Sequence, residues 1–201
     1  MTLRQAEALN TPRIDNHRED SMQATSVLKG LAFGRLFETF ERSAFRLETL
    51  AEYDVEDEPE EMARFLAGKD MGPHWLDNPW VRSMTNKGKA ISRVHVLRSP
   101  LTDYLRYELS TYPGNIRAGE TIGIIDLADQ QVTGLPDHDF WIFDDRTVYR
   151  MHYTADGKFL GGELLPEERL QEYLAWRDLA LAHAVPFASY WDRKLMTTDP
   201  V

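Results

Sequence analysis

The sequence predicts an α/β protein of the mixed α+β type, with a single mixed sheet and helices packed on it. Two patterns carry this prediction. Residues 92–127 follow the order strand, helix, strand, and a helical crossover of this kind joins parallel strands. Residues 139–163 hold three short runs rich in aromatic and β-branched residues, joined by tight turns, which predicts a three-stranded antiparallel meander.

Ahead of the crossover, the sequence predicts two helices with a strand between them. Apolar residues at spacings of three and four predict a helix over 33–42, and alternation predicts a strand over 44–50. Pro59 and several carboxylates suit the first turn of a second helix, which ends at Gly68. The same carboxylates could bind a cation, but their spacing is not that of a calcium loop, so the helix start is favoured.

The crossover begins after a third helix, which Asn78 is expected to cap and which covers about 79–89. In the strand over 92–99, alternation places Arg93 and His95 on one face. A helix over 101–111, a loop over 112–120 and a strand over 121–127 complete the unit.

In the meander, Asp145 and Arg146 form the first turn, and an Asp-Gly pair forms the second. This turn predicts that Asp144 lies near Thr147 in the paired strands. A long helix over 166–184 follows, and the residues after Pro186 are expected to be irregular.

We expect three parts in the chain: an N-terminal extension over 1–28, a single globular domain over 29–191 and a C-terminal tail over 192–201. The 201 residues include no cysteine, which excludes thiol catalysis, thiolate metal sites and disulfides. The sequence has neither a long apolar span nor the apolar core of a signal peptide, so a cytoplasmic protein without a membrane partner is expected. A net charge of −10 argues against direct nucleic-acid binding.

Basic residues concentrate in the segment 82–106, where they outnumber a single aspartate. This segment would suit an anionic ligand or an acidic partner, but a solvated face of mixed charge is the favoured explanation. The loop over 71–80 contains Trp75 and Trp80, and Trp191 lies near the end of the chain. Such aromatic stretches could cover a pocket or contact a partner.

Histidine, arginine and carboxylate side chains gather between residues 93 and 163. The candidates for acid and base catalysis are His95, Tyr104, Asp144 and His152. The candidates for ligand binding are Arg93, Arg98, Arg106, Tyr107, Trp141, Arg150 and Glu163. For each of these residues taken alone, a structural role in salt bridges within the fold is favoured over catalysis. No HExxH, GxSxG, P-loop or GxGxxG motif occurs, so we expect no metal and no cofactor.

Four segments carry a resemblance to a known family: FGRLFETFERSAFRLETLAEYDV, RVHVLRSPLTDYLRYEL, DFWIFDDRTVYRMHY, and FLGGELL with the later AVPFASY. They resemble an uncharacterised actinobacterial domain family that is often encoded beside helix-turn-helix regulators. The resemblance covers about residues 30–190 and implies a small cytoplasmic protein with regulatory neighbours. It implies no activity.

The order of elements is also similar to one half of a phospholipase D-like domain, whose catalytic signature is HxKxxxxD. His138 and Asp145 have the required separation, but Phe140 occupies the lysine position. Without that lysine, phosphate loses its main charge partner, so the resemblance implies a version of the domain without phosphodiester chemistry.

Two functions remain open from the sequence. The first is an accessory or regulatory binding module for a small molecule or a protein partner, which could be a helix-turn-helix regulator or a second copy of the chain. The second is a metal-free and thiol-free enzyme that uses acid and base catalysis in a tailoring or cyclisation step. The absence of any catalytic motif favours the first.

Overall fold

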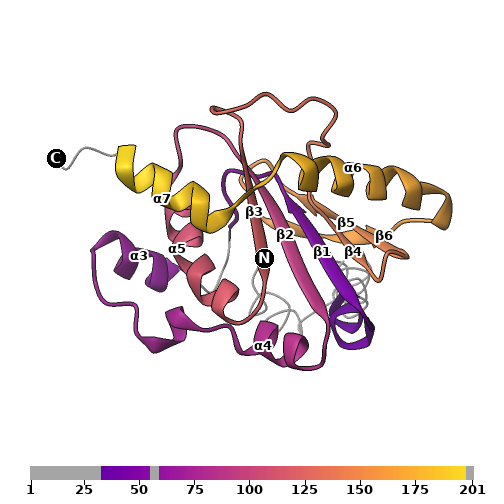
Figure 1. Ribbon diagram of the computed structural model, residues 1–201, viewed down its shortest axis with the longest axis horizontal. Helices are drawn as coiled ribbons and strands as arrows, with labels where there is room; N and C mark the ends of the chain where they lie inside the picture. Colours follow the sequence, from indigo (N-terminus) through magenta and orange to yellow (C-terminus); the bar gives the residue numbers. More distant parts are fainter. Residues whose placement is uncertain (1–32, 55–58, 198–201) are drawn as a thin grey trace, which may run out of the picture.

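The structure, a computed structural model, describes residues 33–54 and 59–197 and shows one seven-stranded mixed sheet with helices on both faces (Figure 1). The predicted α/β class, with its crossover and its meander, is therefore confirmed. The prediction for residues 1–28 lies outside the described part of the chain.

The strands lie in the order β6-β5-β4-β1-β2-β3-β7. Strands β1, β2 and β3 are parallel to one another, and the remaining neighbours are antiparallel. Their bounds are β1 Ser43–Glu48, β2 Ala90–Leu97, β3 Thr121–Asp126, β4 Phe140–Phe143, β5 Thr147–Tyr153, β6 Phe159–Leu164 and β7 Val185–Pro186. The sequence predicted the parallel pair β2 and β3, and the structure adds β1 to it.

The helices match most of the predicted ones. Residues 33–39 are helical, and the later elements are α3 (Pro59–Leu66), η1 (Pro73–Leu76), α4 (Pro79–Asn86), α5 (Asp103–Arg117), η2 (Glu167–Arg169), α6 (Leu170–His183) and α7 (Phe187–Thr197). Glu60 and Glu61 lie in the first turn of α3, as the helix-start interpretation expected. None of the described helices combines the length and hydrophobicity needed to cross a membrane.

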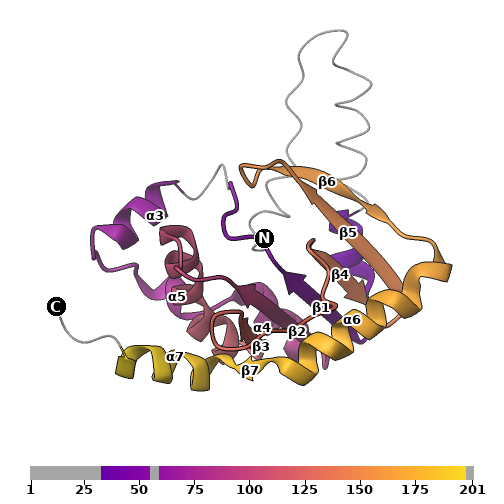
Figure 2. The ribbon, with the colours of Figure 1, turned by 90° about the horizontal axis from the view of Figure 1, so that it is seen from above.

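The two faces of the sheet differ in character. Figure 2 shows α6 along one face, with α3 and α5 on the other. Side chains of β1, β2 and β4 that point toward α6 form one apolar cluster with Tyr173 and Ala180 of that helix. On the opposite face the apolar residues form two clusters, one around Phe37 and Trp141 and one around Leu105.

Between these two apolar clusters, the same face of the sheet carries a strip of charged residues, hereafter the charged strip. Arg46 and Glu48 of β1 and Arg93 and His95 of β2 alternate with the apolar residues that point toward α6. The strand alternation predicted from the sequence is therefore confirmed, but the charged face is buried rather than solvated.

Helix α5 corrects the loop that the sequence predicted over 112–120. The helix continues through Pro113 and Gly114 to Arg117 because tertiary contacts outweigh local propensity here. A Cβ atom on Gly114 would lie 2.6 Å from the backbone oxygen of Trp75, so glycine permits η1 to pack directly on the helix. The buried side chain of Asn115 then accepts a hydrogen bond from Asn78 Nδ2 at 3.1 Å.

The first meander turn differs from the predicted one by one residue. Phe143 pairs with Thr147, which leaves residues 144–146 in the loop. Asp144 and Asp145 have φ values of 55° and 56°, a left-handed conformation that aspartate tolerates better than most residues. The expectation that Asp144 lies opposite Thr147 was therefore wrong.

The residues after Pro186 are also more ordered than predicted. They form α7, whose Tyr190 is buried and donates its hydroxyl hydrogen to Asp126 Oδ2 at 3.0 Å. Phe187 and Trp191 of this helix stack on each other. The apolar cluster around Leu105 thus includes side chains of α7.

The predicted cap of α4 is present and can be tested. Asn78 accepts a hydrogen bond from the Val81 amide at 3.1 Å. We expect Asn78→Ala to lower the free energy of unfolding by about 1–2 kcal/mol, because it removes this cap and the bond to Asn115. Urea denaturation measures the change, and Asn78→Ser should recover part of it because serine is also a good cap. Equal losses in the two variants would contradict the capping role.

Candidate functional site

The charged strip lies at the carboxyl ends of the parallel strands β1 and β2. In the β1–β2 register Arg46 is the partner of Arg93, and Glu48 is the partner of His95. Because partners in register lie side by side, these four side chains share one face of the sheet. Helix α5 covers this place and contributes Glu108 and Tyr112 from positions one turn apart.

Glu48 is the centre of the site. Its Oε1 lies 2.8 Å from Arg46 Nη1, and its Oε2 accepts a hydrogen bond from Arg93 Nη1 at 3.0 Å. The Tyr112 hydroxyl lies 3.4 Å from the same Oε2. Both the Glu48 and the Arg46 side chains are fully buried, so this ion pair is shielded from solvent.

The two arginines also pair with carboxylates at the edges of the site. Arg93 Nε donates to Glu120 Oε1 at 2.6 Å, and Arg46 Nη2 lies 3.5 Å from Asp139 Oδ2. Asp139 is further held by the Tyr53 hydroxyl at 2.7 Å. We call this set the buried charge network; it consists of Arg46, Glu48, Arg93, His95, Glu108, Tyr112, Glu120 and Asp139.

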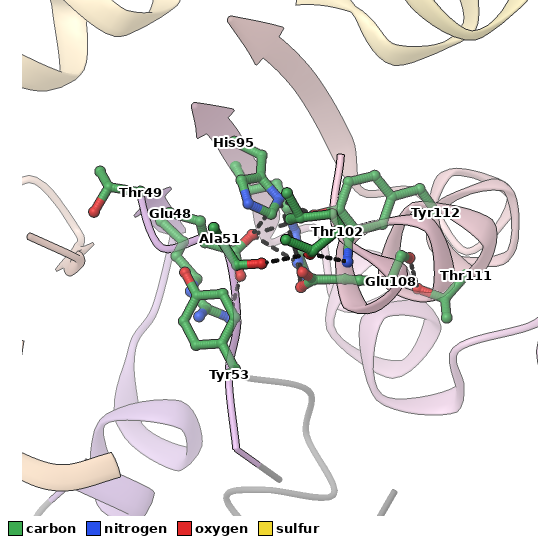
Figure 3. A network of polar contacts seen from close by, with 12 residues as sticks. Glu48, Thr49, Ala51, Tyr53, His95, Thr102, Glu108, Thr111 and Tyr112 are labelled. Atoms are coloured by element: carbon green, nitrogen blue, oxygen red, sulfur yellow. Dashed lines mark hydrogen bonds and ion pairs between the residues drawn. The ribbon is translucent and has the colours of Figure 1, made fainter. Parts of the chain in front are cut away.

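Three hydrogen-bond acceptors of the network converge on one point. His95 Nδ1 lies 3.8 Å from Glu48 Oε2 and 3.9 Å from Glu108 Oε2, and one acceptor atom of each residue lies within 4.8 Å of the others. Figure 3 shows the three side chains, hereafter the acceptor triad, pointing toward one another beside Tyr112. Among the described residues, no hydrogen-bond donor reaches Glu108 Oε2, and His95 Nε2 also lacks a partner.

Burial and charge separate the ionisation of the three groups. Burial opposes the charge of Glu48, but Arg46 and Arg93 hold its pKa well below the ordinary value. Burial raises the pKa of Glu108 to about 8, and repulsion by Glu48 adds to the effect. Burial also lowers the pKa of His95, so its imidazole is neutral at neutral pH. The site therefore combines an ionised and a readily protonated carboxyl group.

The structure brings together only two of the candidate residues that the sequence suggested for this site. Arg93 and His95 are both in the buried charge network. Tyr104 packs against the rings of Tyr53 and Tyr107 at its edge. The four candidate catalytic side chains do not form one site.

Asp144 and His152 lie elsewhere and have structural partners. Asp144 accepts hydrogen bonds from the backbone amides of residues 41–43, next to the first residue of β1 and at the opposite end of that strand from Glu48. His152 lies 3.3 Å from Glu163 in a half-exposed pair on β5 and β6. Arg150 pairs in register with Phe140 of β4.

The remaining candidate ligand-binding residues form no common surface for an anion. Arg106 is exposed near Asp103, Arg98 is exposed, and Tyr107 packs against Phe65 and Trp75. Trp141 lies in the apolar cluster around Phe37, with the Arg46 guanidinium over its ring. Arg93, which points inward, is already paired with carboxylates, so the basic segment does not present an anion site there.

The tryptophans of the aromatic stretches, which could cover a pocket or contact a partner, belong to different parts of the molecule. Trp75 donates to Ser110 and packs on α5, whereas Trp80 packs on the rings of Phe37 and Phe40. Trp191 packs on Phe187 in the apolar cluster around Leu105.

The two residues of the phospholipase D-like signature also have separate partners. His138 Nε2 lies 3.1 Å from the Tyr173 hydroxyl, and Asp145 forms an ion pair with Arg177. Phe140, at the lysine position of the signature, is fully buried against Tyr173. Strand β4 lies between the two signature residues.

The fold and the site together define a mixed α/β domain with a closed, charged centre at the carboxyl ends of its parallel strands. The chain belongs to the family of a domain of unknown function, DUF6879, whose sequence model matches residues 31–192. The predicted resemblance to an uncharacterised family is thereby confirmed. A search of curated proteins finds none that matches.

The role of Asp144 leads to a prediction for acid pH. Burial alone would raise the pKa of Asp144, but the backbone amides of Ser43, Glu41 and Arg42 lower it below its ordinary value. The ionised carboxylate therefore stabilises the fold above about pH 4, and this stabilisation is lost as the pH falls further. We expect Asp144→Asn to lose about 1–2 kcal/mol at neutral pH and progressively less at acid pH, measured by denaturation as a function of pH. A constant difference between variant and wild type would contradict this role.

Proposed function

We propose that this domain is a binding module for a small ligand that carries a positive charge, and that the acceptor triad of Glu48, His95 and Glu108 is its recognition site. One observation carries the proposal: three buried acceptors converge on a point where Glu108 Oε2 has no donor among the described residues. Buried polar groups without partners are rare, and a ligand group is one way to satisfy them.

The place of the triad in the fold supports this proposal. In open sheets with parallel strands, ligands bind outside the carboxyl ends of those strands. Glu48 is the last residue of β1, and His95 is its neighbour on β2. The separation of His95, Asp144 and His152 makes the acid and base enzyme the weaker candidate, because catalysis needs such groups within hydrogen-bond reach of one substrate.

The regulatory part of the proposal comes from the resemblance described above. We therefore propose that the protein is of actinobacterial origin, that its gene lies beside helix-turn-helix regulators, and that its fold is similar to one half of a phospholipase D-like domain. A cytoplasmic accessory protein that passes ligand binding on to such a regulator would combine these features. Binding to a protein partner instead of a small ligand is the alternative outcome.

Native mass spectrometry of the full chain, purified from its own host, tests the proposed function. We expect a retained mass of a small cationic compound, which is lost on mild denaturation. Glu108→Gln should reduce its occupancy, whereas Glu163→Gln, which makes the same chemical change on the exposed surface, should not. A chain that carries only a stable partner protein would contradict ligand binding and support the alternative.

A further inference from the structure

We infer that Glu108 holds a proton until a cation binds at the acceptor triad, and that the cation displaces this proton, so that occupancy of the site rises with pH. This inference rests on the proposed function and specifies how that site is regulated. The hydrogen bonds around the triad, the burial of Glu108 and the ionised state of Glu48 each support it.

The hydrogen bonds of His95 leave no hydrogen for Glu108. The Tyr112 hydroxyl lies 2.7 Å from His95 Nδ1 and 3.4 Å from Glu48 Oε2. In one tautomer of the ring Nδ1 accepts the Tyr112 hydrogen, and in the other Nδ1 donates its own hydrogen to Tyr112. Neither tautomer directs this hydrogen to Glu108 Oε2, which lies 3.9 Å from Nδ1. The converging lone pairs of the triad repel one another unless one of these atoms carries a hydrogen.

The other carboxyl groups of the buried charge network have close donors. Arg46 Nη1 and Arg93 Nη1 lie 2.8 Å and 3.0 Å from the two oxygens of Glu48. Glu120 accepts from Arg93 through both oxygens, at 2.6 Å and 3.3 Å. Asp139 accepts hydrogen bonds at 2.7 Å and 2.8 Å. These donors stabilise the ionised form of each group.

Glu108 has no such support from the residues that the structure describes. Its side chain is 5 % exposed, and none of their donors reaches Oε2. Arg93 Nη1 lies 3.9 Å from Oε1, which is too far for a hydrogen bond. Burial disfavours the charged form of such a group, so Glu108 is the member of the triad that holds the proton.

The charges that act on Glu108 do so in both directions. The titratable and charged side chains around it are Arg46, Glu48, Arg93, His95, Tyr112 and Tyr153. Burial raises the pKa of Glu108 most, and the negative charge of Glu48 adds to this effect. The positive amino terminus of the chain and the two arginines lower this pKa, but the net pKa is still raised to about 8. The proton is therefore held at neutral pH and lost in mildly alkaline solution.

A cation at the triad reverses this balance. Its positive charge beside Glu48 and Glu108 would stabilise the ionised form of Glu108. The proton of Glu108 then passes to solvent, and the cation takes its place between the acceptors. By linkage, such a site binds its cation more tightly as the pH rises toward about 8.

Infrared spectroscopy of the full chain, freed of retained compounds by dialysis at about pH 6, tests whether the proton is present. We expect the C=O stretching band of a buried protonated carboxyl group, which disappears as the pH rises from about 6 to about 9.5. Glu108→Gln should lack this band, whereas Glu163→Gln, which changes a half-exposed carboxylate, should retain it. A wild-type chain without the band, or a band that persists in Glu108→Gln, would overturn the inference.

The pH dependence of unfolding gives a second measurement on the same chain. Because the pKa of Glu108 is raised, the stability that its proton contributes is complete below the ordinary value of 4.5 and is lost as the pH rises through about 8. Relative to Glu108→Gln, the unfolding equilibrium constant of the wild type should increase at least about tenfold between about pH 6 and about pH 8. The variant is expected to fold, since Glu108 Oε2 makes no hydrogen bond within the described part of the chain, and circular dichroism checks this. A ratio that does not change with pH would contradict the inference.

Native mass spectrometry at two pH values tests the coupling to the cation. Protein purified from its own host is equilibrated at about pH 6 and at about pH 9 before the measurement. We expect the occupancy of the retained cation to be at least about fivefold higher at the higher pH, and Glu108→Gln to show low occupancy at both. Equal wild-type occupancy at the two pH values would overturn the inference.

The infrared and mass measurements together separate failure of the inference from failure of the proposed function. A retained cation without the infrared band would overturn the inference and leave the proposed function intact. An infrared band that titrates as expected, in a chain that retains no cation at either pH, would overturn the proposed function and the coupling with it.

Discussion

Glu48→Gln should lower the free energy of unfolding by about 3–5 kcal/mol, one of the largest effects of any conservative substitution in this protein. The change keeps the volume of the side chain and removes its charge. Arg46 and Arg93 both bind Glu48, and both lie in the protein interior, so each would lose a counterion where water cannot replace it. The cost arises from the buried charges that remain rather than from lost packing.

Guanidinium denaturation of wild type and variant at neutral pH measures this effect. Glu163→Gln is the matched control, because its carboxylate is half exposed in a surface pair with His152. Surface pairs contribute little, so the control should change the free energy by less than about 1 kcal/mol. A loss below about 1 kcal/mol in Glu48→Gln would show that the network is open to solvent, contrary to the buried arrangement described above.

Gly162→Ala should produce the second large effect, a loss of about 2–3 kcal/mol or more. A Cβ atom at this position would lie 2.3 Å from the backbone oxygen of Arg150 and 2.4 Å from the Tyr149 ring. The ring belongs to the apolar cluster around Phe37, and the backbone oxygen belongs to the neighbouring strand β5. The backbone oxygen cannot move away without separating β5 from β6, and the Tyr149 ring could move only by disturbing the packing of that cluster.

Gly34→Ala is the control for this substitution. Gly34 lies in the helix over 33–39, and its added Cβ would meet nothing within 4 Å. We expect this variant to be unchanged or stabilised by up to about 1 kcal/mol, since alanine favours the helix. Thermal and urea unfolding of the two variants provide the comparison. Similar stabilities for both would contradict the close packing of β6 on β5.

The sequence was sufficient to predict those helices and strands that are determined by a local residue pattern. The alternation in 92–99 correctly placed Arg93 and His95 on one face, and the side chain of Asn78 marked the start of α4. It was insufficient where distant contacts decide the outcome. Pro113 would normally end a helix, but α5 continues through it to Arg117, and η1 packs on it at Gly114.

The sequence predicted only part of the site, because distant contacts also bring its residues together. Glu48, His95 and Glu108 lie far apart in the sequence, and no motif with fixed spacing could join them. Glu48 becomes the neighbour of His95 because β1 enters the sheet between β4 and β2, an order that the chain does not follow. One signal was available, namely that Arg46 and Glu48 alternate with apolar residues in a strand pattern. Two opposite charges on one face of a strand could have suggested a buried pair.

The charged strip between the two apolar clusters also fixes the alignment of the central strands. A slip of β1 by one residue against β2 would turn Arg46 and Glu48 toward α6, into the cluster that contains Tyr173 and Ala180. Their ion pairs with Arg93 and Asp139 would be lost at the same time. A sheet with this shifted register is therefore strongly disfavoured. The buried charge network thus selects the native strand register over compact alternatives, whatever the network contributes to the stability of the native state.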